Sequence, residues 1–215
     1  MPIIKLDPKL PDSHTLQEAA DVVLKGGIIA YPTETIYGIG ANAFDHDAIE
    51  RIYEIKERDR SKPILIIIRQ TRQLIGLIDH LPRIAGKLVD VFWPGPLTLI
   101  FKASPGLDPG LLGAGGSIGI RIPDNTICLR LLEACEVPLT STSANISGAQ
   151  NPCSIDQVYN NFGNKIDLYL DGGITSGTTP STILDLTTDV PTIRRKGRIS
   201  REKIEQVIGA IIDDT

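Results

Sequence analysis

The stretch STILDLTTDVPTIRR, Ser181–Arg195, decides the fold class of this chain. STILDL and TIRR both have the β-branched and aliphatic content that favours strands, and no helical segment separates them. Parallel neighbours in a sheet need a long crossover connection, usually a helix. The two successive strands therefore predict a mixed sheet rather than a strictly parallel one.

Strands and helices interleave through the rest of the chain. Further strands are predicted in IIAYPT up to Pro32, in ILIII (Ile64–Ile68), and in LTLIFKA, SIGIRIP (Ser117–Pro123), the stretch from Pro138 and KIDLYL. Helices are predicted from the cap Ser13 to Gly26-Gly27, after Asp45 or Asp47, near Gln73–Ile78, Arg83–Phe92 and Ser154–Phe162, from the cap Asp124 to about Glu136, and from Ser200 to about Ile212. No repeat or long linker interrupts this pattern, so the 215 residues are expected to form one domain.

Composition and charge exclude several classes of protein. Hydrophobic residues make up 41% of the chain and aromatic residues 5%, which predicts a core built mainly from Ile, Leu, Val and Ala. The net charge of -4 argues against a uniformly basic nucleic-acid binder, but it is compatible with a local basic cleft. The start of the chain lacks a signal peptide's apolar stretch, and no apolar run approaches the ~20 residues that span a bilayer. These features predict a soluble, cytoplasmic protein that binds no membrane.

The residue types that usually hold metals form no ligand motif. The chain has three cysteines without CxxC spacing and three scattered histidines, namely Cys128, Cys135, Cys153, His14, His46 and His80. An odd number of cysteines suggests no disulfide framework, and the spacings match no zinc site. We therefore expect no resident metal.

Small polar and basic side chains gather where several predicted strands end. PLTSTSANISG, Pro138–Gly148, passes from a buried strand into a run of hydroxyls and an amide. The other such segments are YPTETIYGIG (Tyr31–Gly40), KERDRSKP (Lys56–Pro63), SIGIRIP and TIRRKGR (Thr192–Arg198). If these ends converge, they form a pocket of arginine forks and small donors that suits a polyanion. A nucleoside triphosphate is the leading candidate.

Each of these segments also has an ordinary structural interpretation. A Lys/Arg-rich loop is most often a solvated surface, STSAN can be a capped turn, and the glycine loop Gly110–Gly116 is either a lid or a plain mobile loop. The chain has no Walker A sequence, no GxGxxG fingerprint and no plausible Ser-His-Asp or Cys-His set. This pattern favours chemistry by positioning and charge neutralisation, such as phosphoryl or nucleotidyl transfer.

Taken together, the ordered motifs resemble a known family. They are YPTETIYGIG, KERDRSKPI, FWPGPLTLI, IGIRIPDN, PLTSTSANISG, STILDL and IRRKG, and the resemblance runs from about Ser13 to Ile208. The chain is similar to the YrdC-type threonylcarbamoyl-AMP synthases, which include TsaC, YwlC and the YciO branch. The resemblance implies a single α+β domain over residues 1–215, of YrdC/RibB-like fold, without the extra C-terminal domain of longer relatives. It implies a twisted mixed sheet flanked by helices around a positively charged cavity.

The resemblance also implies a reaction. Family members convert L-threonine, bicarbonate and ATP into threonylcarbamoyl-AMP and pyrophosphate, for the threonylcarbamoyl modification of tRNA adenosine. Mg²⁺ accompanies the ATP, and RNA, tRNA or proteins of the tRNA-modification complex are further expected partners. Two alternatives remain open: a YciO-like RNA-binding or nucleotide-binding protein with little synthase activity, and carbamoyl-adenylate chemistry on another acceptor.

Carried over by motif, the family's functional residues fall on defined positions. The implied catalytic set is Lys56, Arg58, Ser143 and Asn145. The implied ATP contacts are Lys56, Arg58, Lys62, Ser117, Ser143, Asn145, Asn151 and Arg195, and the implied threonine contacts are Thr35, Arg121, Ser141 and Ser181. For Glu34 two roles stay open: a general base, or a carboxylate that orients an arginine or lysine.

The chain departs from the family pattern at four positions. Asp59 stands where many relatives have Pro, Lys62 where many have Asn, Ile67 where many have His, and Asn151 where Ser is common. The Lys62-Pro63 pair is similar to the YciO branch. These departures bear on the reaction rate and the amino-acid specificity more than on the fold.

Overall fold

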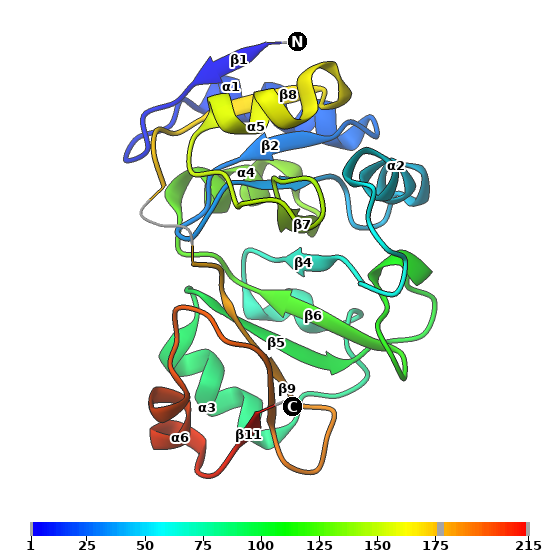
Figure 1. The fold of residues 1–215 in the computed structure, drawn as a ribbon, viewed down its shortest axis with the longest axis vertical. Helices are drawn as coiled ribbons and strands as arrows, with labels where there is room; N and C mark the ends of the chain where they lie inside the picture. Colours follow the sequence, from blue (N-terminus) through cyan, green and yellow to red (C-terminus); the bar gives the residue numbers. More distant parts are fainter. Residues whose placement is uncertain (1, 176–178, 214–215) are drawn as a thin grey trace.

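The strands form one mixed sheet that runs the length of the molecule (Figure 1). The computed structural model describes residues 2–175 and 179–213. Within these residues the strands are β1 (Ile3–Lys5), β2 (Ile29–Tyr31), β3 (Gly38–Gly40), β4 (Leu65–Ile67), β5 (Leu97–Lys102), β6 (Ser117–Arg121), β7 (Leu139–Ser143), β8 (Leu168–Asp171), β9 (Thr182–Asp185), β10 (Thr192–Arg195) and β11 (Ile212–Asp213). Their order across the sheet is β1-β8-β2-β3-β7-β4-β6-β5-β9-β10-β11.

Parallel and antiparallel neighbours are both common in this sheet. Parallel pairs include β4 with β6 and β5 with β9, and antiparallel pairs include β3 with β7 and β5 with β6. The two strands of the Ser181–Arg195 stretch, β9 and β10, pair antiparallel, with Ile193 opposite Leu184. The mixed sheet predicted from that stretch is confirmed.

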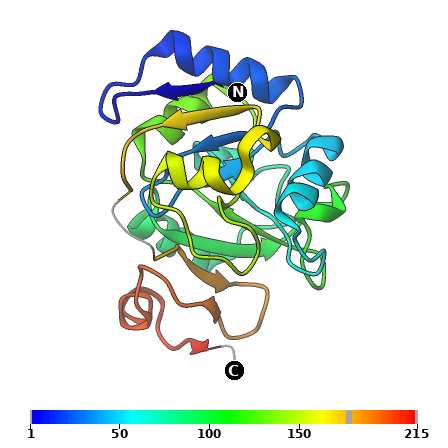
Figure 2. The ribbon, with the colours of Figure 1, turned by 45° about the horizontal axis from the view of Figure 1, so that its top comes forward.

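Six α-helices and three short 3₁₀ helices complete the described fold. They are α1 (Ser13–Leu24), α2 (His46–Lys56), α3 (Arg83–Phe92), α4 (Thr126–Cys135), α5 (Ile155–Phe162) and α6 (Arg201–Ile208), with η1 (Thr71–Leu74), η2 (Pro109–Leu111) and η3 (Gly163–Lys165). Figure 2 shows β8, β1 and α1 at one end of the molecule and β10, α6 and β11 at the other.

Two predicted helix caps were wrong by one residue. Asp12, not Ser13, caps α1, because its carboxylate reaches the backbone N–H of the third helical residue. Asn125, not Asp124, caps α4 in the same way. At the start of α2 the cap is Asp45, which was one of the two residues expected.

The helix predicted near Gln73–Ile78 is absent. The chain forms η1 and then turns at Gly76, whose φ of +88° is a left-handed conformation that glycine adopts without strain. Ile78 then forms an isolated bridge with Ala103, so its backbone pairs with another strand-like segment instead of continuing a helix.

The last helix is shorter than predicted. It ends at Ile208, because Gly209 takes a φ of +84°. Ile212, which the sequence prediction placed inside the helix, belongs to β11 and pairs parallel with Thr192 of β10. An apolar residue in a C-terminal segment fits either structure, so periodicity alone did not separate them.

Helices cover both faces of the sheet. Neighbouring residues of a strand point to opposite faces, so apolar side chains on both faces need a helix to pack against. In β2, Ile29 and Tyr31 pack with α1 and α4, whereas Ala30 packs in the cluster that contains residues of α2 and α5. In Figure 1, α5 lies over β8 and β2. Because β2 is buried on both faces, its sequence is apolar throughout.

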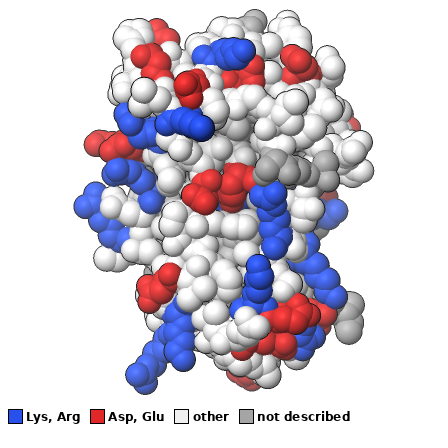
Figure 3. Space-filling model, turned by 90° about the vertical axis from the view of Figure 1, so that its left-hand side faces the viewer, with Lys and Arg blue, Asp and Glu red and all other residues white. Residues whose placement is uncertain are grey.

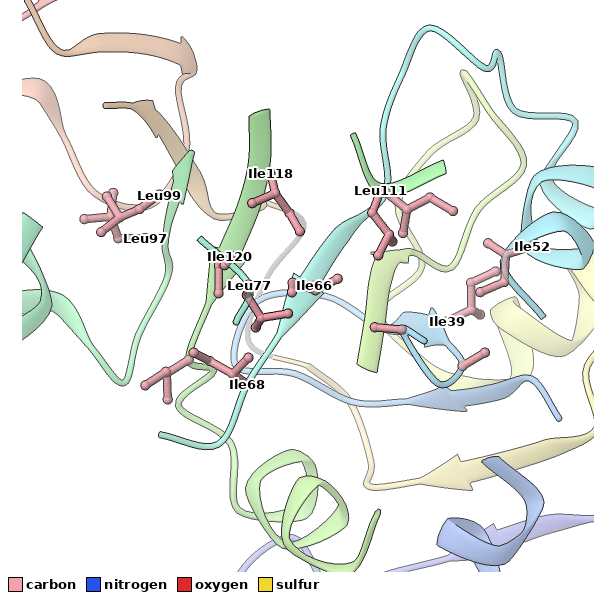
Figure 4. Packing of buried hydrophobic residues seen from close by; sticks show 14 of the residues in the cluster. Ile39, Ile52, Ile66, Ile68, Leu77, Leu97, Leu99, Leu111, Ile118 and Ile120 are labelled. Carbon is pink, nitrogen blue, oxygen red and sulfur yellow. The ribbon is translucent and has the colours of Figure 1, made fainter. Parts of the chain in front are cut away.

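The larger core cluster connects the two ends of the sheet. It includes Ile39 of β3, Ile66 of β4, Ile120 of β6 and Leu99 of β5, all buried (Figure 4). At the far end, α3 and α6 pack against each other. This continuous core fixes the relative positions of the strand ends that carry the polar segments.

Across residues 2–175 and 179–213, every helix is too short or too polar to cross a bilayer.

Candidate functional site

A cavity lies where the polar strand ends meet. Among the described residues, its polar lining consists of Thr33, Thr35, Tyr37, Arg58, Thr98, Arg121, Ser141, Thr142, Ser143, Asn151, Ser181 and Arg195. Eight of the residues proposed from the sequence are in this set: Thr35, Arg58, Arg121, Ser141, Ser143, Asn151, Ser181 and Arg195. Four others, Lys56, Lys62, Ser117 and Asn145, are not among the lining residues. The convergence expected of the five polar segments is therefore observed, because each of them contributes at least one lining residue.

Three arginines give the cavity its charge. Arg58, Arg121 and Arg195 come from three different segments and all line it, whereas the described lining residues include no Asp or Glu. Burial, and then the charges of Arg121 and Arg58, lower the pKa of Arg195 to about 10. Arg195 is still protonated at neutral pH, so the cavity presents a cationic wall that favours an anionic ligand.

Main-chain carbonyls hold two of these arginines in place. Arg58 donates from Nε to the carbonyl of Lys62 at 2.8 Å and from Nη2 to that of Pro63 at 3.0 Å. Arg195 donates from Nε and Nη2 to the carbonyl of Ser181, at 3.1 and 3.0 Å. Carbonyl partners orient a guanidinium without neutralising it, so the positive charge stays available to a ligand.

Arg121 is paired with the carboxylate of Glu34. Nη1 of Arg121 lies 2.5 Å from Oε1 of Glu34, and the two side chains are only 8% and 12% exposed. The backbone carbonyl of Glu34 accepts a hydrogen bond from Arg198. Of the two roles left open for Glu34, the orientation of an arginine is the one with a contact in the structure. A role as general base stays a prediction.

Some residues of the STSAN segment line the cavity, and others stabilise the turn that follows β7. Ser141 and Ser143 line the cavity, and Oγ of Ser143 donates to Oδ1 of Asn145 at 2.5 Å. Asn145 is buried and donates from Nδ2 to the carbonyl of Ala149 at 2.6 Å. Asn145 therefore closes the turn and orients Ser143, and its predicted contact with ATP stays a prediction.

Lys56 is buried behind this turn. It is the last residue of α2, is 1% exposed, and its Nζ donates to the carbonyls of Ser143 and Asn145. Nζ also lies 6.0 Å from the centre of the Phe162 ring. These contacts tie α2 to the STSAN turn. The predicted contact of Lys56 with phosphate is untested, and its position is that of a residue that holds the turn.

The burial of Lys56 predicts a pH dependence of stability. Burial, and then the nearby charge of Arg58, lower its pKa to about 7, from an ordinary value of 10.5. Between these two values the unfolded chain binds more protons at this site than the folded chain, so folding becomes more favourable as the pH rises. We expect the free energy of unfolding to increase from pH 7 to 9 more steeply in the wild type than in Lys56→Met, as measured by urea denaturation. Equal slopes would contradict this expectation.

Lys62 and Ser117 lie outside the cavity lining. Lys62 is exposed, and its carbonyl accepts from Tyr53 and Arg58. Ser117 begins β6, and its carbonyl accepts from Gly113 at 2.8 Å. Both backbones thus support neighbouring segments, while the predicted ATP contacts of the two side chains stay predictions.

The sequence analysis missed Thr98 and Pro180 as lining residues. Thr98 lies in β5, is fully buried, and its Oγ1 is 2.9 Å from Oγ of Ser181. A signal was present: Thr98 is a polar residue inside the apolar run LTLIF. Pro180 directly precedes β9 and carried no comparable signal.

Within the described residues, no group of three or more His, Cys, Asp or Glu side chains is arranged to hold a metal ion.

Comparisons with known proteins identify the family and the fold. The family Sua5_yciO_yrdC, described as "Telomere recombination", matches residues 21–197. A threonylcarbamoyl-AMP synthase of Pyrococcus abyssi is 41% identical over 193 residues, which are 90% of this chain and 57% of the relative. A Bacillus subtilis protein of the same name is 37% identical over 91% of this chain and 57% of its own length. The chain thus spans a little over half the length of these two relatives.

Solved structures show the same fold. A crystal structure of P. abyssi Sua5 complexed with L-threonine superposes with a TM-score of 0.96 at 38% identity, covering 100% of this chain and 63% of that one. The crystal structure of Escherichia coli YciO gives 0.87 at 29% identity, covering 94% and 98%. The expected single-domain fold is confirmed by these neighbours. The fold brings three arginines to one cavity. The family model matches most of the chain, and this chain therefore belongs to the Sua5/YciO/YrdC family.

Proposed function

We propose that this chain is an L-threonylcarbamoyladenylate synthase, a nucleotidyltransferase that acts on ATP, L-threonine and bicarbonate. The observation that carries the proposal is the cavity, in which three arginines and seven Ser/Thr hydroxyl side chains converge, without an acidic side chain among the described lining residues. Such a site fits two substrates that each carry an anionic group, a carboxylate and a polyphosphate, held side by side. The names of the relatives and the threonine complex of P. abyssi Sua5 support the same choice.

In this proposal threonine binds on the side of Arg121. The guanidinium, already oriented by Glu34, binds the carboxylate of the amino acid, because a fork matches two carboxylate oxygens. Thr35, Ser141 and Ser181 supply small hydrogen-bonding groups around it, since all three line the cavity. Ile67 also lines the cavity and gives it an apolar surface.

ATP binds on the side of Arg58 and Arg195. Both guanidiniums keep their charge while bonded to carbonyls, so they can neutralise phosphate oxygens. Ser143 and Asn151 line the same cavity, and Lys62 and Ser117 are the further proposed contacts. Because no acidic side chain of residues 2–175 or 179–213 lines the cavity, Mg²⁺ enters in this proposal as the counter-ion of ATP.

The chemistry needs orientation and charge neutralisation. The threonine amine attacks the carbon of bicarbonate, water leaves, and a carbamate forms. A carbamate oxygen then attacks the α-phosphorus of ATP, and the bond to pyrophosphate breaks. Arg58 and Arg195 stabilise the charge that develops on the leaving group. Holding the reactants together contributes on the order of several kcal/mol to catalysis.

The product is a mixed anhydride of a carbamate and AMP, so it requires an acceptor. We propose that tRNA adenosine receives the threonylcarbamoyl group, with the transfer carried out by proteins of a tRNA-modification complex in the cytoplasm. The surface of the chain gives direct RNA binding little support. The face shown in Figure 3 mixes basic and acidic side chains, whereas phosphate-backbone binders usually present a broad basic surface.

The proposal is tested by pyrophosphate release from the purified chain with Mg²⁺ and ATP. We expect release only when both L-threonine and bicarbonate are present, and little with serine, valine or alanine. Measurable ATP binding without threonine-dependent release would overturn the proposal. It would favour a nucleotide-binding protein with little synthase activity, and the similarity to YciO would then be the more informative one.

A further inference from the structure

Thr98 has a buried hydroxyl group, and the proposed function gives this residue no role. It lies in β5, is 0% exposed, and lines the cavity. Its two γ substituents point to different neighbours: a Cβ at Gly119 of β6 would lie 3.6 Å from the Thr98 methyl, whereas Oγ1 lies 2.9 Å from Oγ of Ser181. The strand therefore buries the methyl group against β6 and directs the hydroxyl to Ser181.

Ser181 is already a hydrogen-bond acceptor for a cation. Nη2 of Arg195 donates to its Oγ at 3.1 Å. A guanidinium has no acceptor atom, so this bond has only one direction and uses one lone pair of the serine oxygen. The serine hydroxyl keeps one further lone pair and its single proton.

The direction of the hydrogen bond between Thr98 and Ser181 decides whether Ser181 can donate its own proton to a ligand. Among the described residues, Ser181 Oγ is the only hydrogen-bond partner of Thr98 Oγ1. If Ser181 donated to Thr98, the buried Thr98 proton would have no acceptor, at a cost of roughly 1–3 kcal/mol. If Thr98 donates to Ser181, both lone pairs of Ser181 are filled, and its own O–H is free to point into the cavity.

We infer that Thr98 is a positioning residue that makes Ser181 a hydrogen-bond donor toward the carboxylate-bearing substrate. The inference rests on the proposed function, in which that substrate is L-threonine beside Arg121. An acceptor lone pair at Ser181 would repel an anionic oxygen, whereas an outward O–H donates a charge-assisted hydrogen bond to it. Thr98 thus contributes to amino-acid affinity without contacting the ligand.

Steady-state kinetics of four variants test this role. Thr98→Val keeps the shape of the side chain and removes its proton, so we expect the KM for L-threonine to rise about tenfold while the KM for ATP changes by less than about twofold. Thr98→Ser keeps the proton and loses the methyl group, so it should retain the wild-type KM for L-threonine. In the background of Ser181→Ala, Thr98→Val should have no additional effect on that KM, because both changes remove the same donor.

A matched control separates positioning from general packing. Thr192 is also buried in a strand and donates to the carbonyl of Val190 at 3.0 Å, but it does not line the cavity. Thr192→Val should therefore leave both KM values unchanged. An unchanged KM for L-threonine in Thr98→Val, or equal effects of Thr98→Val and Thr98→Ser, would overturn the inference while leaving the synthase proposal intact. A wild type without threonine-dependent turnover would overturn both.

Discussion

Arg58→Ala is expected to lower kcat/KM for ATP by about 100- to 1000-fold. Arg58 lines the cavity, and two carbonyls hold its Nε and Nη2. The substitution removes a positioned positive charge that we place against the phosphates, and such charges act most strongly when the pyrophosphate group leaves. The measurement is the initial rate of pyrophosphate release over a range of ATP concentrations.

Arg60→Ala is the matched control, because it removes an arginine from the same loop. Arg60 is exposed, pairs with Glu50 and lies 4.7 Å from the centre of the Tyr53 ring, and it is not among the lining residues of the cavity. We expect kcat/KM within about twofold of the wild-type value, since an exposed ion pair contributes little. Equal losses in the two variants would mean that the loop needs positive charge in general rather than Arg58 in the cavity.

Arg121→Lys is expected to raise the KM for L-threonine by about 10- to 100-fold with a much smaller effect on the KM for ATP. Lysine keeps the charge that balances the buried Glu34, so the fold should persist. It lacks the planar fork that binds two carboxylate oxygens at once. Kinetics with each substrate varied separately give the two KM values.

Arg194→Lys tests whether the loss of any arginine–carboxylate pair has the same consequence. Arg194 pairs with the buried carboxylate of Asp185 at 2.9 Å, but it does not line the cavity. Its substitution should lower the melting temperature modestly and leave the KM for L-threonine unchanged. If Arg121→Lys raised the KM values for ATP and L-threonine by the same factor, our assignment of Arg121 to the amino acid would be wrong.

The parts of the fold that were predicted well are those with a strong local signal. The buried strand ILIII contains β4, and α3 has the predicted bounds Arg83–Phe92. Strand β3, which consists of Gly38–Gly40, was not predicted, because its sequence GIG has little β propensity. Gly40 is required by a close backbone approach, because a Cβ at this position would lie 2.0 Å from the carbonyl oxygen of Thr140. Such a close approach of two backbones is a tertiary fact that local sequence does not carry.

The site was predicted in outline for a similar reason. Hydroxyls and arginines at strand ends signalled a pocket, and the sheet brings Arg58, Arg121 and Arg195 together as expected. Local sequence did not show that Lys56 lies outside the cavity lining and donates to the carbonyls of Ser143 and Asn145. A lysine beside an arginine in a basic loop looks the same from the sequence whether it is solvated, bound to a ligand or buried. The packing of the end of α2 against the turn after β7 decides between these, and it depends on the tertiary fold.

The most direct test of the central claim is mass spectrometry of the nucleotide product made from ¹³C-labelled bicarbonate, ATP, Mg²⁺ and L-threonine. The account predicts a threonylcarbamoyl-AMP that is heavier than the product from unlabelled bicarbonate by the mass difference between one ¹³C and one ¹²C atom, and that disappears when threonine is omitted. An AMP derivative without the label, or no adenylate from a chain that still binds ATP, would contradict the claim that this cavity joins threonine, bicarbonate and ATP.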